Sequence, residues 1–100
     1  NYEHPQARIN FWMTSIVLQK GAPVDRATLR AKLKERKIDT RPFFYPISFF
    51  PMYSHMNVGN PNSYYTGLNG INLPSGVKLT EEQVDYIAAN IRELLTGRKL

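Results

Sequence analysis

Aromatic and proline residues gather in one segment that could line a binding site. Residues 42–53 hold three prolines and six aromatic residues. Proline-rich loops normally run over the surface because their backbone polar groups need water, and six exposed aromatic rings would form an apolar patch that monomers rarely tolerate. Two interpretations of this segment stay open. In the first, its four phenylalanines fold back over this domain's own sheet. In the second, part of the segment faces another domain, another subunit or a ligand.

Arg41 directly precedes this segment and favours the second interpretation. A guanidinium beside an apolar wall can bind a carboxylate or a phosphate through two parallel hydrogen bonds. The alternative is that Arg41 is an ordinary exposed arginine at the end of a strand.

Residues for other kinds of chemistry are scarce. The chain has no cysteine, and His4 and His55 lie far apart without ligand-like spacing, so neither a disulfide framework nor a structural zinc site is expected. The sequence has no nucleophile-elbow pattern, glycine-rich phosphate loop or paired metal carboxylates. Three of the six lysines, at residues 32, 34 and 37, lie on or beside a basic helix at residues 26–36. An imine-forming lysine needs a depressed pKa, usually from burial or cationic neighbours. These lysines have cationic neighbours but lie on a face that solvent should reach, so we predict no catalytic, cofactor-binding or metal-ligating residue here.

The charge is unevenly distributed along the chain. The net charge is +5, and residues 26–41 hold seven basic against two acidic side chains, whereas residues 80–95 are acidic. One basic and one acidic helix face, both exposed to solvent, explain this pattern. The alternative is a basic surface that binds the phosphates of a nucleic acid. Proteins that bind nucleic acids, however, usually have aromatic residues between the basic ones, and residues 26–41 have none. The chain has neither an apolar run of the ~18 residues needed to span a membrane nor a secretory leader, so a membrane partner is not expected.

Local signals predict three helices. Asp25 is a suitable N-cap for a helix over residues 26–36. Asn60 followed by Pro61 predicts a short helix that ends near Gly70. Thr80 and Gln83 form a capping-box pattern before an amphipathic helix that Gly97 ends.

Three strands are predicted, one before each of these helices. The aromatic and β-branched run at residues 11–18 is expected to be a largely buried strand. Residues 38–41 precede Pro42 and should be extended, and residues 71–73 precede Pro74. One hundred residues, 42% of them hydrophobic, suffice for one small domain over residues 1–100. The order predicts an α+β fold of two layers, with about three mainly antiparallel strands and helices on one face.

Three blocks of the sequence resemble one enzyme family. They are residues 11–18, residues 33–46 with Pro51-Met52-Tyr53, and residues 70–76 with 79–84. In this order they resemble the C-terminal domain of the DegT/DnrJ/EryC1/StrS aminotransferases and cover nearly the whole chain. The run from Thr40 to Pro46 looks most like the perosamine-synthase type of sugar aminotransferase, an activity of O-antigen polysaccharide biosynthesis.

The resemblance implies a cytoplasmic, homodimeric enzyme of fold type I that uses pyridoxal phosphate. It would move an amino group from glutamate to a nucleotide-linked keto-deoxysugar. The cofactor-bearing lysine would belong to a large N-terminal domain that is absent from these residues. The chain starts at Asn1 without an initiator Met, which fits a piece cut from something longer. Alone it is expected to bind no cofactor and to be inactive; its implied role is to dock on the large domain and complete the substrate cleft.

The same resemblance implies four substrate-binding residues: Arg41, Phe43, Tyr45 and Ser48. Arg41 would supply positive charge to an anionic group of the substrate, and the two aromatic rings would wall the cleft. Many relatives have histidine where this chain has Ser48, whose hydroxyl can still donate or accept a hydrogen bond. The alternatives are a stand-alone module that docks a protein through residues 42–53, and a small basic nucleic-acid-binding domain.

Overall fold

The computed structural model describes residues 2–56 and 59–97. Within them the chain forms three α-helices, three short strands and two 3₁₀ turns. Their order is β1 (Ser15–Val17), α1 (Arg26–Glu35), β2 (Arg41–Pro42), η1 (Ile47–Phe49), η2 (Pro51–Met56), α2 (Pro61–Asn69), β3 (Gly70–Asn72) and α3 (Glu81–Thr96). The predicted α+β class is confirmed.

The sheet is built around β3, the last strand in the sequence. The order is β1-β3-β2, and both pairings are antiparallel, as predicted. Ile16 and Pro42 both pair with Ile71, while Ser15 and Arg41 both pair with Asn72. Side chains of paired residues share a face and alternate along each strand. The sheet therefore has an Ile71 face and an Asn72 face.

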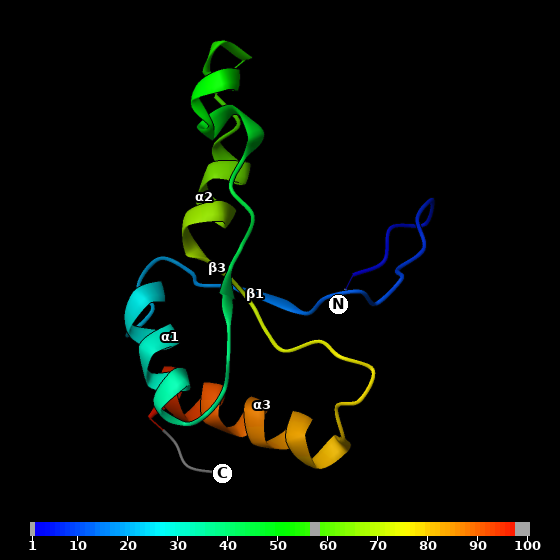
Figure 1. Ribbon diagram of the computed structural model, residues 1–100, viewed down its shortest axis with the longest axis vertical. Helices are drawn as coiled ribbons and strands as arrows, with labels where there is room; N and C mark the ends of the chain where they lie inside the picture. Colours follow the sequence, from blue (N-terminus) through cyan, green and yellow to red (C-terminus); the bar gives the residue numbers. More distant parts are fainter. Residues whose placement is uncertain (1, 57–58, 98–100) are drawn as a thin grey trace.

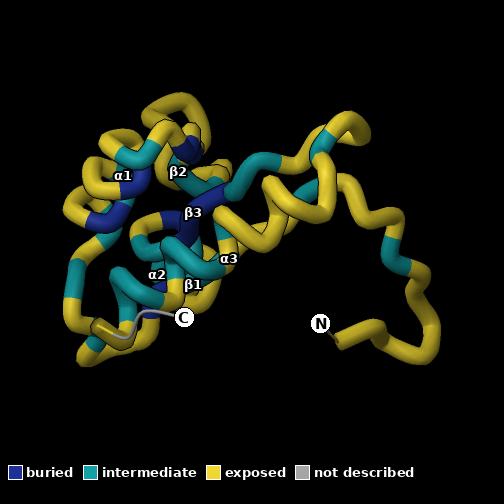
Figure 2. Tube along the Cα trace, turned by 90° about the horizontal axis from the view of Figure 1, so that it is seen from below, coloured by how far each residue is buried: buried dark blue, intermediate teal, exposed yellow. Residues whose placement is uncertain are grey.

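The core lies on the Ile71 face. Ile71, Leu29 and Leu33 are completely buried, and Leu18 and Ile38 are nearly so. Four apolar residues of α3 pack against this cluster: Ile87, Ile91, Leu94 and Leu95. Figure 2 shows the burial concentrated in β3 and α1, while the N-terminal arm lies out in solvent. The core thus joins α1 and α3 to one face of the sheet.

Capping side chains fix where the helices begin and end. The Asp25 carboxylate accepts from the Thr28 amide at 2.7 Å. Thr80 and Gln83 bond each other's backbone amides at the start of α3, and Gly97 ends that helix with a left-handed φ of 72°. These caps confirm the predictions. Asn60 was also predicted as a cap, but its side chain makes no capping bond, and its φ is 29°.

The strands are shorter than predicted. The prediction for residues 11–18 is wrong outside Ser15–Val17. The Leu73 amide still donates to the Thr14 carbonyl at 2.9 Å, but the Thr14 amide donates to the Ser75 hydroxyl at 3.0 Å, and that hydroxyl donates to the Leu73 carbonyl. The side chain of Ser75 thus replaces the second bond of this pair and ends the ladder, and Phe11 further on has a left-handed φ of 54°. The expected burial of this run is also wrong, since Phe11 is 81% and Trp12 66% exposed.

The second strand begins later than expected. Residues 38–41 were predicted, but Lys37 has a left-handed φ of 62° and the Ile38 amide still bonds the Leu33 carbonyl at 2.9 Å. This C-terminal cap holds the chain against α1, so pairing starts only at Arg41. The proline of β2 lies in an edge strand, where a missing amide is tolerated.

The aromatic segment leaves the sheet after β2 and runs alongside α2 to the far end of the molecule (Figure 1). It contains the turns η1 and η2 rather than irregular chain throughout. Neither is an α-helix, because the prolines forbid one. In the part of the chain described, no helix is long and apolar enough to cross a membrane.

Candidate functional site

Arg41 lies on the Asn72 face of the sheet, away from the core. Its side chain is 80% exposed, and its Nε lies 3.6 Å from the carboxylate of Asp39, which is 81% exposed. An ion pair so open to water contributes little, so Asp39 leaves the guanidinium available to a ligand. Both residues line a shallow cavity of about 340 Å³, together with Trp12, Phe44 and Asn72.

An aromatic wall borders this cavity. The rings of Trp12 and Phe44 stack with centroids 6.1 Å apart and planes at 21°. They are 66% and 59% exposed. A cation next to an open aromatic surface suits a ligand with an anionic group and a flat or apolar part. Trp12 was not among the predicted site residues, because an aromatic residue in a predicted strand has the same signature as a core residue.

Phe43 and Tyr45 line a neighbouring cavity of about 410 Å³ between the aromatic segment and α2. The Phe43 amide donates to the Gly70 carbonyl at 3.0 Å, and its half-buried ring lies against the Gly70 backbone. Tyr45 is 38% exposed and stacks on Phe49, with centroids 4.9 Å apart. The Arg26 guanidinium touches the Tyr45 hydroxyl and ring.

Ser48 is buried, with 9% of its surface exposed. Its hydroxyl lies 2.9 Å from the hydroxyl of Tyr64, a residue of α2. The hydrogen-bonding capacity expected of Ser48 is therefore used inside the domain, where it fastens η1 to α2. The four predicted residues thus fall into three places: Arg41 in one cavity, Phe43 and Tyr45 in the next, and Ser48 beneath the surface.

The aromatic segment does not fold back over the sheet as a whole. Phe43 does so in part, whereas Phe44, Phe49 and Phe50 stay 43–59% exposed. The radius of gyration is 15.5 Å, compared with about 13 Å for a compact domain of this length. The molecule therefore offers more open apolar surface than a self-contained domain of its size.

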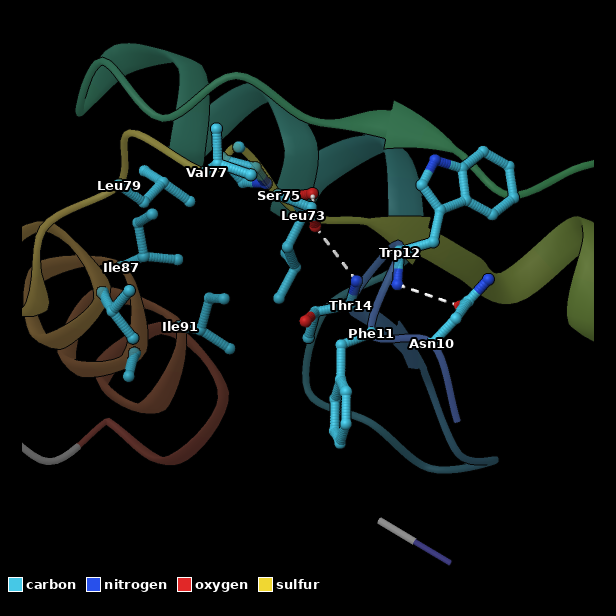
Figure 3. A pocket seen from close by; sticks show the side chains of 14 residues that line it. Asn10, Phe11, Trp12, Thr14, Leu73, Ser75, Val77, Leu79, Ile87 and Ile91 are labelled. Atoms are coloured by element: carbon cyan, nitrogen blue, oxygen red, sulfur yellow. Dashed lines mark hydrogen bonds between the residues drawn. The ribbon is translucent and has the colours of Figure 1, made fainter. Parts of the chain in front are cut away.

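A cavity larger than these two lies elsewhere, between the N-terminal arm, residues 73–79 and α3. It measures about 840 Å³, and Figure 3 shows Phe11, Leu73, Ile87 and Ile91 pointing into it. The Ser75 hydroxyl closes one side by accepting from the Thr14 amide at 3.0 Å. None of the described residues that line this cavity has a titratable side chain. It is an apolar cleft without the groups that acid–base or nucleophilic chemistry needs.

The basic residues of α1 do not form one free stripe. Its two arginines and the arginine that follows it turn to partners inside the domain: Arg26 to the carbonyl of Gly67, Arg30 to that of Thr40, and the C-cap Arg36 to Asn90 and Glu93. This arrangement weakens the interpretation of α1 as a phosphate-tracking surface.

Lysines and carboxylates are the remaining side chains that could hold a cofactor or a metal ion. All five lysines within residues 2–56 and 59–97 are exposed and line neither of the two cavities at the aromatic segment, and Lys99 lies outside the described residues. Over the same residues no three His, Asp or Glu side chains come close enough to hold a metal ion. Hydrogen bonds from the Thr28 amide, then from the Thr28 hydroxyl, hold the pKa of the Asp25 carboxyl below its usual value.

The chain matches the model of the DegT/DnrJ/EryC1/StrS aminotransferase family over residues 2–92. It is 40% identical over 88 residues to a GDP-perosamine synthase of Escherichia coli O157:H7, covering 88% of this chain and 24% of that protein. A GDP-perosamine synthase of Vibrio cholerae is 39% identical over 85 residues, covering 83% of this chain and 23% of its own length. The chain thus spans about a quarter of these relatives.

Solved structures show a similar fold. A protein of Streptococcus pneumoniae assigned as a sugar aminotransferase superposes in its PMP form with a TM-score of 0.71 at 20% identity, covering 85% of this chain and 22% of its own. Its apo form gives a TM-score of 0.70 at 22% identity, with the same coverage. At such identity the likeness concerns the fold.

Proposed function

The chain belongs to the DegT/DnrJ/EryC1/StrS aminotransferase family, and from this premise we propose that it is the small C-terminal domain of a sugar aminotransferase. The complete enzyme transfers an amino group from glutamate to a GDP-linked keto-deoxysugar, as expected of a protein related to GDP-perosamine synthases. This domain completes the substrate cleft. The cytoplasmic location expected from the resemblance stays a prediction.

One observation carries the proposal: an accessible cation lies beside an aromatic surface that the domain itself leaves open. Arg41 has only an exposed, weak ion pair with Asp39, and the Trp12 and Phe44 rings next to it are more than half exposed. A nucleotide-linked sugar has phosphates for the guanidinium and flat or apolar faces for the rings. The same open surface suits a domain that another domain covers.

The residues have distinct proposed roles. Arg41 binds an anionic group of the substrate, and Phe43 and Tyr45 form the adjacent wall. Ser48 acts indirectly, because its hydroxyl bonds Tyr64 and so keeps η1 on α2. In this proposal Ser48 does not touch the sugar, in contrast to a histidine at the same position, which would contact it directly.

Pyridoxal phosphate belongs to the proposed complete enzyme, but the described residues do not fit it. The lysines at residues 20, 32, 34, 37 and 78 are exposed, and none lies in the cavities next to Arg41 and Tyr45. A cofactor-bearing lysine needs a secluded site that tunes its reactivity. The cofactor is therefore held by a large domain outside these residues, in an enzyme that we propose to be a homodimer.

The decisive assay uses the complete gene product with glutamate and a GDP-linked keto-deoxysugar, and detects the GDP-linked amino sugar by mass spectrometry. Arg41→Ala should lower kcat/KM at least about tenfold, equivalent to about 1.4 kcal/mol of transition-state binding. Arg92→Ala removes an exposed arginine of α3 and is the matched control, expected to leave kcat/KM unchanged. Failure to transfer the amino group refutes the function, whereas an unchanged kcat/KM for Arg41→Ala removes only Arg41 from the site.

The 100-residue chain provides a second test. Titrated with pyridoxal phosphate, it should show no shift of the cofactor's absorbance, while the complete gene product should shift it. A shift with the short chain alone would place a cofactor-binding lysine within these residues and contradict the division of roles.

The exposed aromatic segment also favours a second candidate, a stand-alone module that docks a protein through residues 42–53. The two candidates differ in the complete gene product. Only the aminotransferase domain requires a large cofactor-binding domain and a product with an amino group.

A further inference from the structure

Arg26 is a half-buried arginine whose side chain leaves its own helix. It is the first residue of α1 and directly follows the Asp25 cap. The N-terminus of a helix carries a partial positive charge, so the helix itself disfavours a cation there. The reason for an arginine at this position lies in what its guanidinium contacts.

The first contact is with the end of α2. Nη1 donates to the Gly67 carbonyl and, at 3.4 Å, to the Gly70 carbonyl. The last four carbonyls of an α-helix have no partner within the helix, and a cation is favoured at that end. Arg26 therefore satisfies a free end of α2 and ties it to the start of α1.

The second contact is with the aromatic segment. Nη2 lies 3.5 Å from the Tyr45 hydroxyl oxygen, and Cζ lies 6.0 Å from the centroid of the Tyr45 ring. A guanidinium within about 6 Å of a ring is attracted by the negative face of that ring. Tyr45 also stacks on Phe49, with planes at 17°. The Tyr45 ring is thus held both by a cation and by a second ring.

The backbone of the aromatic segment is held at the same place. A Cβ at Gly67 would lie 3.0 Å from Pro46 Cδ, 3.2 Å from the Phe44 carbonyl oxygen and 3.5 Å from Tyr45 Cα. Glycine thus lets the segment cross α2 at close range. Arg26, Gly67 and Tyr45 form one contact cluster, to which Arg26 contributes the charge.

We propose that Arg26 is a positioning residue for the substrate cleft, which fixes the ring of Tyr45 and affects substrate binding through that ring. This inference rests on the proposed function, in which Tyr45 is part of the cleft wall. Arg36, the C-cap of the same helix, differs, because its guanidinium bonds Asn90 and Glu93 of α3, at 2.7 and 3.0 Å.

The test is steady-state kinetics of the complete gene product with Arg26→Met, Tyr45→Ala and the double variant. Arg26→Met should raise KM for the nucleotide sugar about three- to tenfold and leave kcat within about twofold, because binding changes and the reacting groups do not. In the Tyr45→Ala background the same change should add less than about twofold, since the two residues act as a coupled pair.

Two further variants separate positioning from folding. Arg26→Lys keeps the charge but not the planar fork, so its KM should lie between those of the wild type and Arg26→Met. Arg36→Met is the matched control: it removes the half-buried arginine at the C-cap of α1, which bonds another helix, and should leave KM unchanged. If Arg26→Met does not fold, Arg26→Lys alone is compared in both Tyr45 backgrounds.

The outcomes are distinct. Equal effects of the Arg26 change with and without Tyr45 overturn the inference, as does a KM that Tyr45→Ala raises and Arg26→Met does not. A KM that is unchanged in Tyr45→Ala overturns both the wall role of Tyr45 and this inference, while amino transfer by the wild type still supports the proposed function. Loss of amino transfer in the wild type refutes the proposed function itself.

Discussion

Gly70 is a position where adding a single methyl group is expected to cause a large loss of folding stability. Its φ of −91° suits any residue, so the effect of Gly70→Ala is steric and not conformational. A Cβ there would lie 2.6 Å from the Thr66 carbonyl oxygen and 2.7 Å from Phe43 Cβ. Neither atom is the end of a flexible side chain. The added methyl group must therefore push β3 away from α2 or away from Phe43.

The cost follows from the contacts that such a shift disturbs. Overpacking a well-filled site costs about 1–3 kcal/mol. The Phe43 amide bonds the Gly70 carbonyl at 3.0 Å, and weakening that bond adds about 1 kcal/mol. We expect Gly70→Ala to destabilise the domain by about 2–4 kcal/mol, a large part of the 5–15 kcal/mol typical of a folded domain.

The measurement is denaturant unfolding of the complete gene product, followed through the transition that exposes this domain. Gly76→Ala is the matched control, because no atom lies within 4 Å of its added Cβ, and it should stay within about 0.5 kcal/mol of the wild type. A Gly70→Ala variant as stable as Gly76→Ala would refute the close packing of Phe43 on β3, and with it the placement of the cleft wall.

Further changes test the helices and the core. Thr80→Ala removes the capping box of α3 and should cost about 1 kcal/mol in unfolding experiments, whereas no loss would contradict the cap. Leu33→Ala empties a completely buried site and should cost about 2–5 kcal/mol; a cost under about 1 kcal/mol would contradict its place in the core. Because hydrogen bonds from Thr28 lower the pKa of Asp25 in the folded state, its stabilising effect should be complete above the unfolded pKa of about 3.9 and be lost as pH falls through the lower folded value. Asp25→Asn should keep the cap but remove this pH dependence below about pH 4, which measurements of the unfolding free energy against pH detect. If the wild type and Asp25→Asn lose stability equally as the pH falls below about 4, the prediction is contradicted.

Helices were predictable because their signals are local. Asp25 caps through Thr28, three residues on, and Thr80 through Gln83. Strand ends were less predictable because they depend on partners far along the chain. The Ser75 hydroxyl, which accepts from the Thr14 amide and donates to the Leu73 carbonyl, decides where β1 stops, and no pattern in residues 11–18 indicates it. Tertiary pairing overrode the β propensity of this run.

For the candidate site, too, the features that depend on long-range packing could not be predicted from the sequence. The sequence left two interpretations of the aromatic segment open, burial over the domain's own sheet or partial exposure, because composition does not show which rings find a partner. The structure shows partial exposure, with Phe44, Phe49 and Phe50 still 43–59% exposed. The burial of Ser48 and its bond to Tyr64 depend on how η1 meets α2. The role of Arg26 has one weak indication in the sequence: it is a cation at the N-terminus of a helix, where the helix dipole disfavours positive charge.

The most direct test of the account is a crystal structure of the complete gene product with a bound GDP-linked amino sugar. The account predicts that the Arg41 guanidinium lies within hydrogen-bond distance of an anionic group of that ligand and that the Tyr45 ring contacts it. A ligand bound away from residues 41–48, with the aromatic surface still open to solvent, would contradict the central claim that this domain completes the substrate cleft.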